Sequence, residues 1–145
     1  MGRIMAIDFG TKRIGIAVTD PMKIIASPLE TVSTGGIMTF LDNYLKKEEV
    51  EEFVVGYPRQ MNNTPSEAIR HINPFIKKLK NRYPGIKINL ADERFTSKMA
   101  FQALIAGGVK KKDRQDKALI DKISASLILQ SFLEAGINKK DKEFK

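Results

Sequence analysis

Two apolar stretches joined by a short turn constrain the fold of this chain more than any other feature. Residues 4–9 and 14–19 are almost entirely apolar, and Gly10-Thr11-Lys12 lies between them. Short apolar runs bounded by turn residues are typical of buried strands, and so short a connection favours an antiparallel hairpin. A third strand is expected over residues 24–32, where Pro28 suits a sheet edge because it has no backbone donor. The chain therefore begins with a three-stranded meander.

Helical and strand patterns alternate along the rest of the chain. Apolar residues recur with helical spacing after Gly36, and Pro84-Gly85 ends a second helical stretch. The expected elements are a helix after Gly36, a strand over 52–56, a helix from 65 or 66 to 82, a strand over 86–91, a helix from 96 or 97 to 107, and a helix over 115–135. This order, βββαβαβαα, predicts an α/β fold in which a mixed five-stranded sheet carries helices on both faces.

The length and composition indicate the number of domains and exclude several kinds of chemistry. A chain of 145 residues suits one domain, which we expect over residues 1–136, with a flexible basic tail over residues 137–145. The sequence has no Cys, which excludes disulfides, thiolate chemistry and structural zinc. No apolar stretch approaches the ~18 residues of a membrane span, so we expect a cytoplasmic protein with no membrane partner.

The net charge of the chain is +8 at pH 7. The last eight residues contribute only +2 of it, from four Lys, one Asp and one Glu, so the excess belongs to the domain. A basic domain favours polyanionic partners, nucleic acid first, because phosphate contacts with Lys and Arg release counterions. The alternative is a basic protein without such a partner.

Carboxylates stand where two of the expected strands end. Asp8 closes the first strand, and Asp92-Glu93 follow the strand over 86–91. Open α/β sheets bind ligands at the carboxyl edge of their strands, so these side chains are candidates for a site. The alternatives are structural, with Asp8 as the start of a turn and Asp92-Glu93 as solvated acids before a helix. The strand pattern alone leaves both interpretations open.

Asp121 falls on the apolar side of the last expected helix. Polar residues recur every four positions from Lys122 onward, whereas Asp121 shares its row with apolar residues. A charge buried on a helix needs a counter-charge or a metal ion. The small residues Ser124 and Ala125 would let the helix lie close to the sheet. The alternative is an ion pair with a nearby base, Lys117 or Arg114.

Together these positions predict a metal site. Two strand ends on neighbouring central strands and one inward helix position would bring three carboxylates to one place. Crowded carboxylates repel one another unless divalent cations neutralise them. Oxygen ligands suit Mg²⁺ or Mn²⁺, and two such ions ~3.5–4 Å apart hydrolyse phosphodiester bonds in two-metal nucleases. Asp8 would then be a metal ligand in a nuclease.

Four motifs in order give the sequence a specific resemblance over residues 4 to about 134. They are "AIDFGTKRIGIAVTD", "VVGYPRQM", "DERFTS" and "KALIDKISASLILQSF". The chain resembles the YqgF family, RuvX-like nucleases of the RNase H-like superfamily. The resemblance implies an RNase H-like fold, catalytic and metal-binding roles for Asp8, Glu93 and Asp121, and thus the choice of Glu93 over Asp92. It also implies one of two activities: 5′-end processing of the pre-16S ribosomal RNA, which we favour on family grounds, or resolution of branched DNA.

The resemblance is incomplete at three places. The family usually has Asp-Gly where this chain has Asn62-Asn63, a glycine where it has Ala118, and an alanine where it has Ser126. None of these departures touches the three acids.

Basic residues supply candidate phosphate contacts. Residues 110–117, KKKDRQDK, carry five basic residues against two acids and directly precede the helix that bears Asp121. The candidate nucleic-acid-binding residues are Lys12, Arg13, Arg59, Arg94, Lys110, Lys111, Lys112, Arg114 and Lys117. The alternative to phosphate binding for each of them is a solvated side chain. For Arg94 a second alternative is an ion pair with Asp92. His71, the sole histidine, is expected to be exposed on a helix and to have no catalytic role.

Two other classes of protein share parts of this pattern. The "IDFGT" stretch also resembles the first phosphate loop of actin-like ATPases and sugar kinases, but those enzymes close two domains around ATP and this chain provides one. A non-catalytic nucleic-acid-binding module would keep the fold and the charge. Cleavage that depends on Mg²⁺ and on Asp8 distinguishes a nuclease from such a module.

Overall fold

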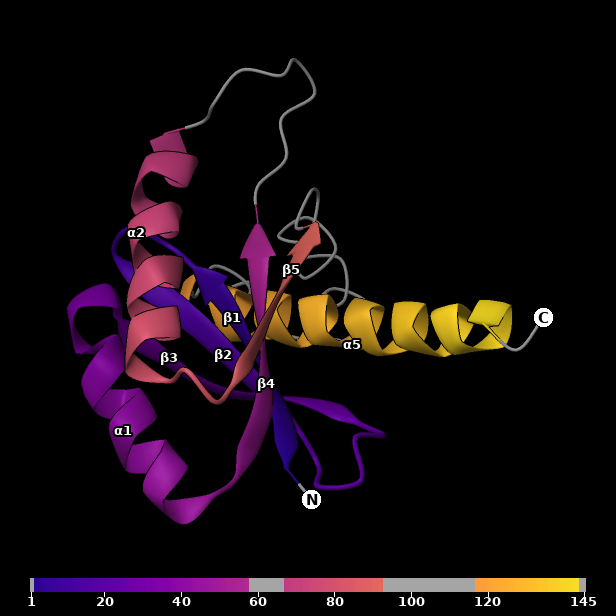
Figure 1. Cartoon of the computed structure of the whole chain (residues 1–145). Coiled ribbons are helices and arrows are strands. Elements are labelled where there is room, and N and C mark those ends of the chain that lie inside the picture. The colour runs from indigo at the N-terminus through magenta and orange to yellow at the C-terminus, as the bar shows by residue number, and fades with distance from the viewer. Residues whose placement is uncertain (1, 58–66, 93–116, 144–145) are drawn as a thin grey trace.

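The computed structural model describes residues 2–57, 67–92 and 117–143, which form one five-stranded mixed sheet with helices on both sides (Figure 1). The strands lie in the order β3-β2-β1-β4-β5. Their bounds are β1 Arg3–Phe9, β2 Arg13–Thr19, β3 Ala26–Ser33, β4 Val50–Tyr57 and β5 Lys87–Asp92. The strands β1, β2 and β3 pair antiparallel, whereas β4 is parallel to both β1 and β5. The predicted meander and mixed sheet are confirmed.

Three described α-helices cover the two faces of the sheet. The helix α1 spans Ile37–Lys47 after the short 3-10 turn Thr34–Gly36, α2 spans Glu67–Arg82, and α5 spans Lys117–Glu143. Figure 1 shows α1 and α2 together on one side of the sheet and α5 crossing the other. The expected helix from 96 or 97 to 107 lies outside the described residues.

Strand alternation sends the residues of β1 to two separate cores. Met5 and Ile7 join the larger cluster with α1 and α2, and Ile4 and Ala6 join the smaller cluster with α5. Successive side chains of a strand point to opposite faces, so β1 must be apolar at every buried position. The same alternation places Asp8 on the face covered by α5.

The edge position expected from Pro28 is confirmed. The strand β3 lies at one end of the sheet, and Pro28 pairs with Ala17. The register shifts between Ile16 and Ala17, since their partners are Glu30 and Pro28 and Leu29 is passed over. Such a bulge fits an edge strand that has lost one backbone donor to proline.

Two expectations differ from the structure. The first and last predicted strands are not neighbours, because β4 pairs with β1 on one side and β5 on the other. The last helix does not end at Ala135, and residues 137–143, expected in a flexible basic tail, belong to α5. A glycine at position 136 costs a helix only about 1 kcal/mol, and the lysines that follow suit a helix C-terminus. In the described residues, no helix has the length and apolar character needed to span a membrane.

Candidate active site

One edge of the sheet collects the ends of several elements. The strands β1, β4 and β5 run parallel, so their carboxyl ends lie at the same edge, and Asp8 is the next-to-last residue of β1. Because β2 is antiparallel to β1, its first residue, Arg13, lies at that edge too. The start of α5 packs there as well, because Asp121 contacts β2 at Gly15. This is the edge at which open α/β sheets bind ligands.

Gly15 brings Asp8 and Asp121 to the same place. Asp8 lies directly opposite Gly15 in the pairing of β1 with β2. A Cβ atom built on Gly15 would lie 2.0 Å from the carbonyl oxygen of Asp121 and 2.3 Å from its carbonyl carbon. Only a residue without a side chain allows the backbone of α5 to come this close. Asp8 and Asp121 therefore both adjoin Gly15, on the same face of the sheet.

Small side chains make this close approach possible along the first turns of α5. Ser124 and Ala125 are buried, and on the sheet they face the side that carries Ala6, Gly15 and Ala17. The prediction that small residues beside Asp121 let its helix lie near the sheet is confirmed. The prediction that Asp121 shares a row with buried apolar residues is also confirmed, because Ala125 and Ile128 are both buried.

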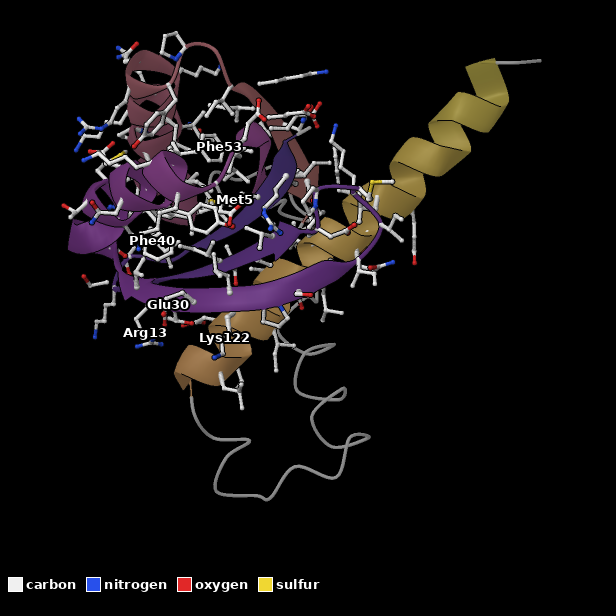
Figure 2. The ribbon with its side chains drawn as sticks, turned by 90° about the horizontal axis from the view of Figure 1, so that it is seen from below. Met5, Arg13, Glu30, Phe40, Phe53 and Lys122 are labelled. Carbon is white, nitrogen blue, oxygen red and sulfur yellow. The ribbon has the colours of Figure 1, made fainter. Side chains whose placement is uncertain are left out.

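Arg13 is the ion-pair partner of Asp121. Its Nε donates to Oδ2 of Asp121 at 2.9 Å, and the side chains of Arg13 and Asp121 are 39% and 26% exposed. Arg13 stands two residues before Gly15 in β2, so it lies on the face of the sheet that α5 covers. Figure 2 shows Arg13 beside the first turns of α5, where Lys122 is also labelled. The sequence had offered Lys117 or Arg114 as this partner.

The third predicted ligand cannot be placed beside these two. Glu93 lies outside the described residues, and it directly follows Asp92, the last residue of β5. Within residues 2–57, 67–92 and 117–143, no group of three or more His, Asp or Glu side chains is arranged to hold a metal ion. The described part of the site thus offers two carboxylates, Asp8 and Asp121, on one face. Carboxylate oxygens are the ligands that Mg²⁺ and Mn²⁺ prefer, so the donor set fits a hard divalent cation.

Some of the remaining predicted site residues lie near the carboxyl edge of the sheet, and the others lie outside the described residues. Lys12 is exposed in the turn between β1 and β2, and its carbonyl accepts from the backbone N–H of Thr34 at 3.0 Å. Lys117 begins α5, and only its backbone is described. His71 is exposed on α2, as expected. The candidates outside the described residues are Arg59, Arg94, Lys110, Lys111, Lys112 and Arg114.

Sequence reasoning missed the two residues that organise this site, Gly15 and the Arg13 side chain as a partner of Asp121. For Gly15 a signal was present, because an isolated glycine inside a strand pattern indicates close approach of another backbone. For Arg13 there was none, since the pair joins residues 108 positions apart.

Comparisons with known proteins identify the relatives of this chain. The model of the family described as "RuvX: Holliday junction resolvase" matches residues 2–135. A protein of Phocaeicola vulgatus is 54% identical over 133 residues, which are 92% of this chain and 96% of the relative. A protein of Bacteroides fragilis is 53% identical with the same coverage. Both relatives are named "Putative pre-16S rRNA nuclease".

A solved structure shares the fold. The RuvC protein of T. thermophilus, in complex with a Holliday junction substrate, superposes with a TM-score of 0.57 at 18% identity, over 94% of this chain and 96% of RuvC. At this identity the likeness concerns the fold, and it confirms the predicted RNase H-like architecture. With a family model matching nearly the whole length and relatives above half identity, the chain belongs to the RuvX (YqgF) family.

Proposed function

We propose that this chain is a metal-dependent nuclease that hydrolyses phosphodiester bonds during 5′-end processing of pre-16S ribosomal RNA. The observation that carries the proposal is the meeting of Asp8 and Asp121 at Gly15, on the carboxyl edge of the sheet. Two acidic residues from segments more than 100 residues apart thus adjoin one glycine, Asp8 by strand pairing and Asp121 by its backbone. Acidic residues gathered at one edge of a sheet are typical of a binding site. The choice of ribosomal RNA rests on the names of relatives above 50% identity.

The residues proposed to hold the cation are Asp8, Glu93 and Asp121. A bound Mg²⁺ or Mn²⁺ would neutralise charge on the phosphodiester and make a water molecule more nucleophilic near neutral pH. The chain's own residues fix where this happens. Asp8 is held by the pairing of β1 with β2, and Asp121 by the contact of α5 with Gly15. Because both belong to regular elements rather than to loops, their separation is preorganised before substrate arrives.

Nucleic acid is the proposed partner, and phosphate contacts would bring it to the carboxyl edge. Lys12 stands exposed in the turn at this edge, and the basic segment 110–117 leads into α5. The net charge of +8 would draw a polyanion to the protein at long range. We expect the protein to act in the cytoplasm, where ribosomal RNA of this kind is processed. Phosphate contacts do not by themselves distinguish RNA from branched DNA.

A cleavage panel tests the proposal. Purified protein is mixed with a pre-16S RNA fragment, a four-way DNA junction and linear duplexes, under Mg²⁺, Mn²⁺ or EDTA. We expect cleavage of the RNA that requires a divalent cation and falls by at least about 100-fold in Asp8→Asn and Asp121→Asn, because each change removes several kcal/mol of charge stabilisation.

The matched control is Asp20→Asn. Asp20 follows β2 at the opposite edge of the sheet, where its carboxylate accepts from the backbone N–H groups of Met22, Ile24 and Ile25. The substitution removes the same charge without touching the site, so its cleavage rate should match that of the wild type. Cleavage of the junction alone would make the chain a resolvase, and binding without cleavage would make it a non-catalytic module.

A further inference from the structure

A cation of the protein itself is paired with the carboxylate of Asp121. The guanidinium Nε of Arg13 lies 2.9 Å from Oδ2 of Asp121. Arg13, Gly15 and Asp8 share the face of the sheet on which α5 packs. The positive charge of Arg13 thus lies beside the carboxylate proposed to bind the divalent cation.

Electrostatics determines whether Arg13 raises or lowers the affinity of Asp121 for a metal ion. Without a bound cation, carboxylates that converge at one edge repel one another, and a guanidinium at hydrogen-bond distance from one of them relieves that repulsion. With a divalent cation bound to Asp121, the same guanidinium stands within a few ångströms of a second positive charge. Arg13 is thus attracted by Asp121 in the metal-free protein and repelled by the cation in the metal-bound protein. Arg13 therefore favours the metal-free state over the metal-bound state.

We propose that Arg13 is a built-in counter-ion that stabilises Asp121 in the metal-free protein and competes with the divalent cation for its carboxylate. The inference rests on the proposed function, because it takes Asp121 as a metal ligand. Arg13 is here a positioning residue: it acts on the cation through Asp121 and takes no part in bond cleavage. Its consequence is a site that stays ordered when empty and that binds its cation more weakly than the carboxylates alone would.

The size of the competition follows from Coulomb's law. In water-like surroundings, which suit side chains as exposed as these, a unit charge about 6 Å from a divalent ion changes the ion's affinity by about tenfold. Replacing Arg13 by a neutral residue should therefore tighten cation binding by about that factor. If Arg13 instead orients Asp121 for metal binding, the same replacement should weaken cation binding, because loss of the hydrogen bond would leave the Asp121 carboxylate free to move.

The first experiment is a Mn²⁺ titration followed by electron paramagnetic resonance, without nucleic acid. We expect Arg13→Gln to bind Mn²⁺ about tenfold more tightly than the wild type, and Arg13→Lys, which keeps the charge, to bind much like the wild type. The matched control is Arg3→Gln. Arg3 pairs with Glu48 at 3.3 Å at the opposite edge of the same sheet, so this control removes the same charge far from the site.

The second experiment needs no metal. Thermal unfolding in EDTA is measured for the wild type, Arg13→Gln, Asp121→Asn and the double variant. We expect Arg13→Gln to lower the unfolding midpoint in the wild-type background and to leave it unchanged in the Asp121→Asn background. An equal lowering in both backgrounds would overturn the ion pair itself.

The outcomes separate this inference from the proposed function. Equal or weaker Mn²⁺ binding by Arg13→Gln, with normal binding by the wild type, overturns the competition and leaves the metal site standing. Failure of the wild type to bind Mn²⁺ at millimolar concentration overturns the proposed function and the competition together. If Arg3→Gln tightened Mn²⁺ binding by the same factor, the effect would come from the net charge of the protein, and the inference would be overturned.

Discussion

At the scale of single residues, Gly15 determines how close α5 comes to the sheet. Its missing side chain leaves room for the backbone of Asp121, and it pairs with Asp8 in the sheet, so both acidic residues adjoin it. The spacing of polar residues along the helix was enough to predict that Asp121 faces inward. Its partner Arg13 could not be predicted, because that pair depends on which strand the helix crosses.

Gly15→Ala should destabilise the protein and impair the site together. The new Cβ would meet a backbone carbonyl rather than a flexible side chain, so α5 must shift, at a cost of about 1–3 kcal/mol. We expect a lower denaturant midpoint in urea unfolding and weaker Mn²⁺ binding. Gly35→Ala is the control, because a Cβ there has nothing within 4 Å. Unaltered stability in Gly15→Ala would contradict the close contact.

At the scale of elements, one carboxylate joins the two helices on the face opposite α5. Asp42 of α1 accepts hydrogen bonds from Arg82 at the end of α2 and from the hydroxyl of Tyr83. The Arg82 hydrogen bond, followed by that of Tyr83, lowers the pKa of Asp42 to about 2. The ring of Tyr83 also packs on Phe53, with centroids 5.9 Å apart. Asp42 therefore links α1 to the end of α2.

This arrangement predicts an acid-sensitive contribution to stability. A carboxylate whose pKa is lower in the folded state contributes stability above its unfolded pKa, near 4, and loses it as the pH falls toward 2. The thermal midpoint of the wild type should thus fall more steeply between pH 5 and pH 2 than that of Asp42→Asn. At pH 7 the variant should be the less stable of the two. Parallel curves over this range would show that Asp42 is not the linking group.

The sequence predicted the individual elements better than their arrangement. Apolar runs and helical spacing located all five strands and the helices α1, α2 and α5, because those signals are local. They did not show that β4 lies between β1 and β5, since parallel pairing depends on how a crossover packs rather than on either strand alone. The end of α5 was predicted too early, at residue 135, whereas the helix continues through Gly136 to Glu143, because a helix tolerates a single glycine.

At the scale of the whole molecule, basic residues lie at both ends of the strands, at the carboxyl edge of the sheet and at the opposite edge. The carboxyl edge carries Asp8, Arg13 and the start of α5. The opposite edge is approached by the ends of α1 and α2, which carry exposed lysines. If nucleic acid binds at the carboxyl edge, only lysines near that edge should determine its affinity.

Salt dependence tests whether the basic segment 110–117 binds phosphate. Replacing Lys110, Lys111 and Lys112 by Gln should weaken RNA binding and flatten its dependence on salt by about one unit of logarithmic slope per lost phosphate contact. The control replaces three exposed lysines at the opposite edge, Lys46, Lys47 and Lys80. Equal slopes for the two triple variants would show that the segment 110–117 is not the phosphate-binding element.

The proposed function requires that Asp8 and Asp121, far apart in the sequence, adjoin one divalent cation. Nuclear magnetic resonance of ¹⁵N-labelled protein with a small fraction of Mn²⁺ tests this directly, because the ion broadens only nearby amide signals. We predict that the signals of Asp8, Gly15 and Asp121 broaden together and recover with excess Mg²⁺, while those of residues 22–25 at the opposite edge persist. Broadening near Asp121 that spares Asp8, or broadening centred on another part of the chain, would contradict a shared cation site at these two residues.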